Sequence, residues 1–237
     1  MREFLAVAPA AVGARTAETG TAVALAVGAA PRQIEVNRIV GLTAIEQLDE
    51  LRKWYDGAPH WVSLDPAVGL DTEVVARGYR AGYPWQKFER GVGPYAATTD
   101  LQVADARAPD DFAQAVVLGY GLPTAFAGWV ANLVGRAGWH CFVAYDGTAA
   151  AGAGTLYVSG DTGWLGTAAT RPEQRGRGAQ SAILAARVAR ARELGVTRLV
   201  TETGVPRDGA PGASYRNILR AGFRETYVRP NYAAPET

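Results

Sequence analysis

The fold of this chain is decided by one loop segment, Pro172-Glu173-Gln174-Arg175-Gly176-Arg177-Gly178-Ala179-Gln180-Ser181. An apolar stretch of strand type, 163–170, comes directly before it. A longer stretch, 182–194, follows with small and apolar residues at helical spacing. The sequence therefore predicts a strand, a glycine-rich loop and a long helix, with Gly195 placed to end that helix.

Two features of the loop favour an anionic ligand. Gly176 and Gly178 let the backbone approach a ligand closely, and the first N–H groups of a helix have no partner inside it. Together with the helix dipole they suit a phosphate or pyrophosphate. Arg175 and Arg177 add fixed positive charge beside them. On spacing alone, the alternative is a plain glycine-rich turn with two solvated arginines.

Two other nucleotide-binding loops do not fit the segment. It has no Gly-Lys-Ser/Thr ending, which excludes a P-loop. It lacks a Gly-x-Gly-x-x-Gly pattern with an acidic residue about 20 residues later, and the element order is no βαβ repeat, which disfavours a dinucleotide-binding fold.

Outward from the loop, the pattern predicts an α/β domain with a mixed sheet. Asp146-Gly147 between two apolar runs is a strong hairpin signal. The expected order is β-α-α-β-β-β-α-β-α-β, with helices on the faces of the sheet. Strands are expected at 101–107, 140–145, 151–158, 163–170 and 198–203, helices near 110–119, 124–133, 182–194 and 214–221, and a last strand pair within 225–232.

A stretch rich in glycine and small residues, 91–99, has no periodicity and is the best candidate for a domain boundary. It predicts a first domain of residues 1–95 and a second of residues 96–237. The first piece repeats the second half of the element order without similar local sequence, so a partly truncated internal duplication is expected.

Composition narrows the classes of partner. Lys plus Arg number 24 and Asp plus Glu 23, a formal net charge of +1, which gives no overall attraction to nucleic acid or an acidic membrane. With one cysteine and two histidines, we expect no disulfide scaffold and no metal site. The N-terminus lacks the pattern of a signal peptide, and no apolar run is long enough for a membrane span, so we expect a cytoplasmic protein.

The loop Arg175-Gly176-Arg177-Gly178-Ala179 resembles the pyrophosphate-binding loop of the GNAT (GCN5-related) acyl-CoA N-acyltransferase superfamily, Gln/Arg-x-x-Gly-x-Gly/Ala. Gln180 stands where the last small residue is usual. The elements around the loop follow the family order, so the resemblance covers roughly residues 99–232. It implies a GNAT fold, preceded by a truncated GNAT-like domain that has Val40 to Glu46 at the loop position and binds no CoA.

The resemblance also implies the residues that hold acetyl-CoA or another acyl-CoA, with no metal. The loop backbone would bind the pyrophosphate, and the end of the preceding strand the pantetheine arm. A backbone N–H of Ala168 or Ala169 would polarise the thioester carbonyl, and Ser214 and Asn217 would contact the arm or, alternatively, cap a helix. The implied set is Ala168, Ala169, Thr170, Arg175, Gly176, Arg177, Gly178, Ala179, Gln180, Ser214 and Asn217.

The implied catalytic residues are Glu202 and Tyr215. Glu202, at the sheet position that borders the acceptor site in this family, would accept the ammonium proton; its alternative role is an ion pair with Arg198 or Arg224. The usual tyrosine acid is replaced by Ile218, and Tyr215, one turn earlier, is either its substitute or a packing aromatic. Weaker candidates for the base are Tyr120, Tyr157 and His140, while Cys141 is expected to be buried and inert.

The resemblance implies an acyl-CoA-dependent N-acyltransferase, most simply an N-acetyltransferase whose acceptor is a small-molecule amine. A catalytically silent acyl-CoA-binding module and a protein N-acetyltransferase are the alternatives. The charge balance gives no support to a macromolecular acceptor. The expected assembly is a monomer or a homodimer.

Overall fold

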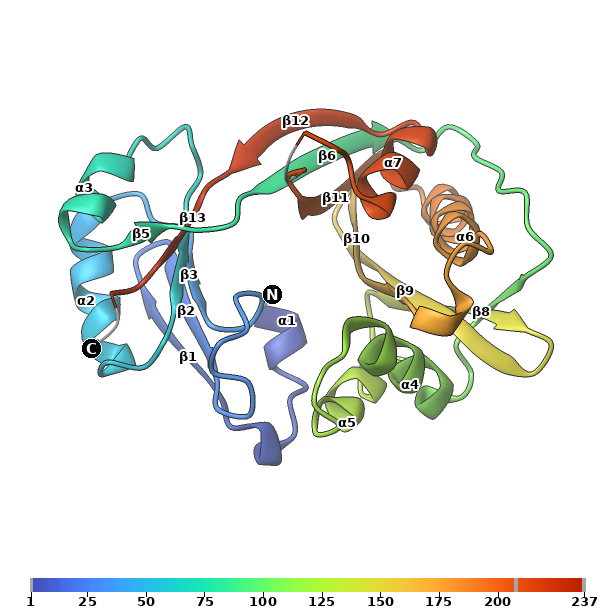
Figure 1. Cartoon of the computed structure of the whole chain (residues 1–237), viewed down its shortest axis with the longest axis horizontal. Coiled ribbons are helices and arrows are strands. Elements are labelled where there is room, and N and C mark those ends of the chain that lie inside the picture. The colour runs from blue at the N-terminus through green and yellow to red at the C-terminus, as the bar shows by residue number, and fades with distance from the viewer. Residues whose placement is uncertain (1, 207–208, 236–237) are drawn as a thin grey trace. The chain divides into compact units, whose positions relative to one another are not determined.

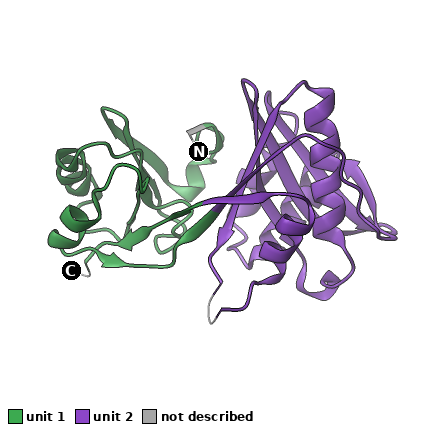
Figure 2. Ribbon diagram, turned by 90° about the horizontal axis from the view of Figure 1, so that it is seen from above, with its two compact units in different colours: residues 1–86, 227–237 green, residues 87–226 purple. Residues whose placement is uncertain are grey.

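The computed structural model describes residues 2–206 and 209–235. The chain forms two compact units, unit 1 with residues 1–86 and 227–237, and unit 2 with residues 87–226 (Figure 2). The sequence placed one boundary between residues 95 and 96, whereas the chain passes from one unit to the other twice. The end of the chain returns to the first unit, which local sequence gives no means of predicting.

Unit 1 is built on a six-stranded sheet of order β1-β2-β3-β4-β13-β5. Its first two strands form an antiparallel hairpin, and every residue of the second is buried. The elements are α1 (Arg2–Leu5), the 3-10 helix η1 (Ala10–Val12), β1 (Ala14–Thr19), β2 (Ala22–Val27), β3 (Arg38–Val40), α2 (Ile45–Tyr55), β4 (Trp61–Ser63), α3 (Asp71–Ala76), β5 (Arg80–Ala81) and β13 (Asn231–Ala233).

Unit 2 is built on a seven-stranded sheet of order β12-β6-β11-β10-β9-β8-β7. The predicted hairpin at Asp146-Gly147 is confirmed, since β8 and β9 pair antiparallel around it. The elements are β6 (Trp85–Gly91), β7 (Gln102–Asp105), α4 (Pro109–Tyr120), α5 (Phe126–Ala131), β8 (Trp139–Asp146), β9 (Ala149–Ser159), β10 (Thr162–Thr170), the 3-10 helix η2 (Pro172–Gln174), α6 (Ala179–Glu193), β11 (Arg198–Gly204), α7 (Ala213–Arg220) and β12 (Arg224–Arg229).

Helices cover both faces of the second sheet (Figure 1). On one face α6 and α7 bury a core that includes Ile183, Leu199 and Ile218. On the other face lie α4 and α5, with the fully buried Phe112 and Trp129. The mixed α/β fold that the sequence predicts is thus confirmed, and α6 ends where Gly195 adopts a left-handed conformation with φ 74°.

The two sheets share one topology. In each, a strand leads through a helix to a parallel neighbouring strand: β3, α2 and β4 in the first, β10, α6 and β11 in the second. In each sheet, the second strand of this pair is separated by one inserted strand from the strand that follows the next helix. The inserted strand comes from a distant part of the chain. That inserted strand is β13 in the first sheet and β6 in the second.

The inserted strands correct the expected end of the chain. The sequence predicts a pair of strands within 225–232, and two strands form there, but they do not pair with each other. Strand β12 is the edge of the second sheet, whereas β13 pairs with β4 and β5. Both stretches have strand patterns, and only the tertiary fold assigns each to its sheet.

Candidate functional site

The glycine-rich loop joins β10 to α6 in unit 2. Gly176 and Gly178 have φ of 82° and 87°, the left-handed region that favours glycine. Gly178 is the N-cap of α6 and supplies no side-chain cap. Among the described residues, the N–H groups of Gly178, Ala179, Gln180 and Ser181 have no hydrogen-bond partner. Four unpaired donors at the positive end of a helix dipole form a site for an anion.

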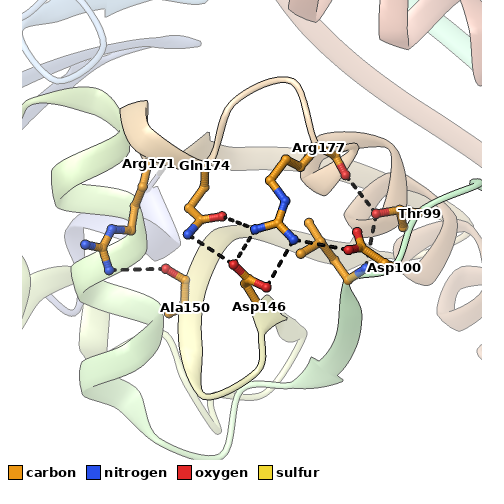
Figure 3. A network of polar contacts seen from close by, with 8 residues as sticks. Thr99, Asp100, Asp146, Ala150, Arg171, Gln174 and Arg177 are labelled. Atoms are coloured by element: carbon orange, nitrogen blue, oxygen red, sulfur yellow. Dashed lines mark hydrogen bonds and ion pairs between the residues drawn. The ribbon is translucent and has the colours of Figure 1, made fainter.

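The loop is held in place by the Arg177 side chain (Figure 3). Its guanidinium forms ion pairs with Asp146 and, at 3.1 Å, with Asp100, and donates a 3.0 Å hydrogen bond to Gln174. Arg177 holds the pKa of Asp146 below its usual value. The positive charge that the sequence predicts beside the ligand is therefore neutralised at Arg177, whose side chain organises the loop instead.

Thr99 also holds the loop, through the loop backbone (Figure 3). Its hydroxyl donates a 2.8 Å hydrogen bond to the backbone carbonyl of Arg177, and a Cβ placed on Gly178 would lie 3.1 Å from the Cβ of Thr99. The stretch 91–99 is therefore part of unit 2 and of the loop's support. Tyr95 also packs against the core of this unit.

Arg175 is the loop cation that no carboxylate of the described residues engages. Its guanidinium lies 3.5 Å from the carbonyl oxygen of Gly119, at the limit of a hydrogen bond. Gly119 lets α4 approach β10 closely, because a Cβ there would lie 2.6 Å from the Cβ of Ala169. The anion site and the end of β10 are thus brought together by α4.

Strand β10 is irregular where the sequence predicts the thioester contact. Its pairing with β9 shifts register between Gly166 and Ala169, which leaves Thr167 and Ala168 outside the ladder. Thr167 has φ 45°, a conformation that a β-branched residue adopts only under strain, at a cost on the order of 1–3 kcal/mol. Bulges of this kind free backbone N–H groups from a sheet.

The same segment also leaves its other neighbour. β10 and β11 pair in parallel only from Thr162 to Trp164, with Arg198 to Val200 as partners. Both strands continue beyond this pairing, to Thr170 and Gly204. Unpaired strand edges can hydrogen-bond an extended ligand as another strand would. Ala168, on the bulge, fits the predicted carbonyl contact better than Ala169, which is back in register with Ala153.

Glu202 lies on β11 and forms an ion pair with Lys87 of the adjacent strand β6. Both side chains are largely buried, with relative exposures of 20% for Lys87 and 17% for Glu202. The alternative partners that the sequence suggested are wrong, because Arg198 and Arg224 both pair with Glu89. Lys87 is not among the residues that the sequence predicts for the site; the available signal was its rarity, as one of only two lysines in the chain.

Gln180, Ser214 and Asn217 form one hydrogen-bonded group. The Gln180 side chain donates to the Ser214 hydroxyl at 3.0 Å and accepts from the Asn217 amide at 2.9 Å. Gly212, not Ser214, is the N-cap of α7, so the capping role considered for Ser214 is wrong. These three predicted CoA contacts are brought together at the N-terminal ends of α6 and α7, directly beside the anion site.

Tyr215 is buried in the core and packs edge-on against Phe88. Its hydroxyl donates a 2.6 Å hydrogen bond to Glu225. Burial, with this carboxylate as a further cause, raises the pKa of Tyr215 to about 12. The phenol proton is therefore directed to Glu225, a geometry that suits a packing aromatic more than an acid.

The weaker candidates lie elsewhere. His140 is on β8, three strands from β11, and burial lowers its pKa. Cys141 is buried as expected, and burial raises its pKa to about 12. Tyr120 is exposed at the end of α4.

Aromatic rings line the face of the sheet on which Val200 and Glu202 lie. Trp164 precedes Gly166 on this face, and a Cβ on Gly166 would overlap the Trp164 ring. Trp139 packs against Tyr157, with ring centroids 4.8 Å apart, and edge-on against Trp164 at 6.3 Å. Trp164 and Tyr157 are partly exposed. The bulge is therefore bordered by an aromatic surface and the carboxylate of Glu202.

The corresponding place in unit 1 has a different structure. Only four residues, 41–44, connect β3 to α2. The Gln47 side chain accepts hydrogen bonds from the N–H groups of Thr43, at 2.8 Å, and Ala44, at 3.2 Å. The N–H groups of the two residues that precede the helix are thus already used, and the connection is too short for a glycine-rich loop.

In residues 2–206 and 209–235, no three metal-ligating side chains gather into a group. None of the helices in these ranges is both long and apolar enough to span a bilayer.

The chain is similar to known acetyltransferases. The model of the acetyltransferase (GNAT) family matches residues 109–215, which include the bulge, the loop, α6 and β11. No curated protein sequence is significantly similar.

Solved structures share the fold over nearly the whole chain. A GCN5-related N-acetyltransferase from Kribbella flavida is 13% identical with TM-score 0.68, covering 99% of this chain and 92% of that one. One from Sphaerobacter thermophilus is 16% identical with TM-score 0.64, covering 93% and 84%. A tandem GNAT protein from the clavulanic acid biosynthesis pathway is 14% identical with TM-score 0.61, covering 93% and 81%. Residues 109–215 therefore match the acetyltransferase (GNAT) family, and the chain as a whole shares the fold of these N-acetyltransferase structures.

Proposed function

We propose that this protein transfers the acetyl group of acetyl-CoA to a small-molecule amine at one site, in unit 2. The observation that carries the proposal is the uncapped N-terminus of α6, with four unpaired N–H donors beside the bulge of β10. Anion binding and carbonyl polarisation are thereby available on consecutive segments of the chain.

The residues present fit acetyl-CoA. A side chain at Gly176 would meet no atom within 4 Å, so the loop backbone is open to a ligand. In the proposal, the N–H groups from Gly176 to Ser181 bind the pyrophosphate, with Arg175 as the available cation. The edge of β10 through Thr170 binds the pantetheine arm. Gln180 fixes Ser214 and Asn217 toward the same ligand.

Acetyl-CoA supplies the acetyl group as a thioester, whose carbonyl carbon the amine attacks. The N–H of Thr167 or Ala168, on the bulge, donates to the carbonyl oxygen as negative charge develops there. Glu202 accepts the proton of the substrate ammonium, directly or through water. Lys87 holds the Glu202 carboxylate in position. Tyr215 remains the candidate proton donor to the leaving thiolate, although Glu225 accepts its hydrogen bond.

The aromatic surface favours an acceptor that is apolar or amphipathic around its amine. Trp164 and Tyr157 offer exposed ring area beside the bulge, and aromatic faces attract both apolar groups and cations. Unit 1 binds no CoA in this proposal, because its connection between β3 and α2 has only four residues and Gln47 already binds the N–H groups of Thr43 and Ala44.

Calorimetric titration with acetyl-CoA tests the proposal, using the matched variants Gly178→Ala and Gly195→Ala. Both glycines are left-handed at opposite ends of α6, so each alanine costs stability by about 1 kcal/mol. We expect one site per chain, and an affinity about tenfold lower or worse in Gly178→Ala only, since loss of one charge-assisted hydrogen bond costs about 1.5–3 kcal/mol. Equal affinities in both variants would refute the loop assignment, and two sites would refute the inactive first unit.

A catalytically silent acyl-CoA-binding module is the second candidate. It is favoured because both catalytic candidates already have partners within the protein: Glu202 forms an ion pair with Lys87, and Tyr215 donates a hydrogen bond to Glu225. Release of free CoA in the presence of a panel of aromatic and aliphatic amines separates the two functions. Binding of acetyl-CoA without release for any amine would favour the silent module.

A further inference from the structure

A buried arginine without a counter-ion lies behind the bulge of β10. Arg187, on α6, is 2% exposed. Among the described residues no carboxylate pairs with it, and its hydrogen bonds go only to backbone carbonyls. Removing a charge from water is costly, and burial lowers the pKa of Arg187 to about 10, which leaves it protonated at neutral pH. Such a buried charge is costly to stability, which suggests that the arginine has a role other than packing.

The acceptors of Arg187 belong to Thr155 and Gly166, the last pair of the β9–β10 ladder before the bulge. Its Nη1 donates to the carbonyl of Thr155 on β9, at 3.1 Å, and to that of Gly166 on β10, at 3.4 Å. The Thr155 hydroxyl donates to the same Gly166 carbonyl at 3.0 Å. The guanidinium thus bridges the two strands where their register shifts.

Space for the guanidinium is provided by a glycine. A Cβ on Gly154 would lie 3.3 Å from Cζ of Arg187 and 2.8 Å from Ile183. Strand β9 thus lacks a side chain where the guanidinium lies behind the bulge. The charge, the space for it and the two carbonyls that accept its hydrogen bonds therefore lie at one place beside the bulge.

The orientation of one peptide group follows from these bonds. The C=O of Gly166 and the N–H of Thr167 belong to one planar trans peptide, so they point in opposite directions. Because Arg187 and Thr155 both donate hydrogen bonds to this carbonyl, the Thr167 N–H points away from the two side chains. Thr167 is the residue with φ 45°, outside both neighbouring ladders.

We propose that Arg187 is a positioning residue of the acetyl-transfer site, which fixes the Gly166–Thr167 peptide so that the Thr167 N–H serves as the oxyanion donor. This inference rests on the proposed function. The positive charge also polarises the peptide, because the bonded carbonyl and the N–H share one conjugated group. The role requires no contact between Arg187 and the substrate.

Arg187→Met and Arg187→Lys test the proposal in the full chain, with Arg190→Met as control. Arg190 lies one turn further along α6 and pairs with Asp105 and Glu193. We expect Arg187→Met to lower kcat about 10²-fold, the typical effect of losing an oxyanion donor, while KM for acetyl-CoA changes little. Arg187→Lys should recover part of the rate, and the control should keep all of it.

A second readout does not depend on turnover. The infrared band of the carbonyl in ¹³C-labelled acetyl-CoA should move to lower frequency on binding to the unmodified protein, and less in Arg187→Met. Should Arg187→Met fail to fold, Thr155→Val removes one bond to the same carbonyl without removing a charge, and a smaller change in the same direction is expected.

The outcomes separate the two proposals. If the unmodified protein does not bind acetyl-CoA, the proposed function is refuted, and the role of the Thr167 N–H with it. If acetyl-CoA binds and Arg187→Met keeps both the rate and the infrared shift while losing only thermal stability, Arg187 is structural and this inference alone is refuted.

Discussion

At the scale of single residues, the catalytic question turns on Glu202. Its carboxylate is paired with Lys87 and mostly shielded from water, so it is held in one place. Glu89, two residues further along β6, pairs with two arginines and is equally shielded, with 17% side-chain exposure. Both glutamates thus pair with basic side chains and have the same exposure, and they differ in their position relative to the bulge.

Glu202→Gln should therefore lower kcat by about 10²-fold or more, the usual contribution of a general base. The defect should shrink as pH rises, because more of the amine is then already deprotonated. Rates measured from about pH 6 to about pH 9 check this. Glu89→Gln, the matched control, should lower stability and keep the rate; a Glu202→Gln enzyme that is as fast as the unmodified protein at every pH would remove Glu202 from the mechanism.

At the scale of elements, the loop between β10 and α6 combines an open backbone with a fixed side-chain network. Arg177 connects it to Asp146 at the β8–β9 hairpin and to Asp100 before β7. The anion-binding donors thus stay in position without a cap on the helix. As a consequence, the charge of Arg177 is used to hold the loop and is not available to a ligand.

This network predicts a pH dependence of stability. Because Arg177 lowers the pKa of Asp146 below its usual value of 3.8, the pair's contribution is present above that value and is lost as pH falls through the lower folded-state pKa. Arg177→Met removes the shift, so its stability should fall less steeply in acid. Urea unfolding at a series of pH values below about 5 measures both slopes. Parallel slopes for the two proteins would mean that the pair does not stabilise the fold.

At the scale of the whole molecule, the chain builds each sheet with a strand that is remote in sequence. Strand β6 comes before all other strands of unit 2 in the chain, yet lies between β11 and β12. It supplies Lys87 to Glu202 and Phe88 to the core around Tyr215. Unit 2 therefore depends on residues that precede the expected boundary at residue 95.

Two fragments test this dependence. Residues 96–237 lack β6 and should show no cooperative urea unfolding, because β11 and β12 would each lose a neighbour. Residues 84–229 keep β6 and should unfold cooperatively. Near-ultraviolet circular dichroism and urea titration of both fragments give the answer, and cooperative unfolding of 96–237 would show that β6 is dispensable.

Local patterns by themselves determined the mixed α/β class, the β8–β9 hairpin at Asp146-Gly147, the end of α6 at Gly195 and the segment that joins β10 to α6. Each of these is set by residues close together in the chain, through turn chemistry, helix termination or periodicity. The resemblance to the GNAT family came from the same segment, since its glycines and its place before a helix are local features.

Only the tertiary structure decided which residues meet across long separations in the chain. Lys87 reaches Glu202, Arg187 reaches Gly166, and β13 joins β4 and β5. The pattern of a strand shows which of its faces is apolar, but it does not show which strand will pair with it. The partner of a buried charge is likewise fixed by packing, so the residues around the reacting atoms become visible only once the sheets are assembled.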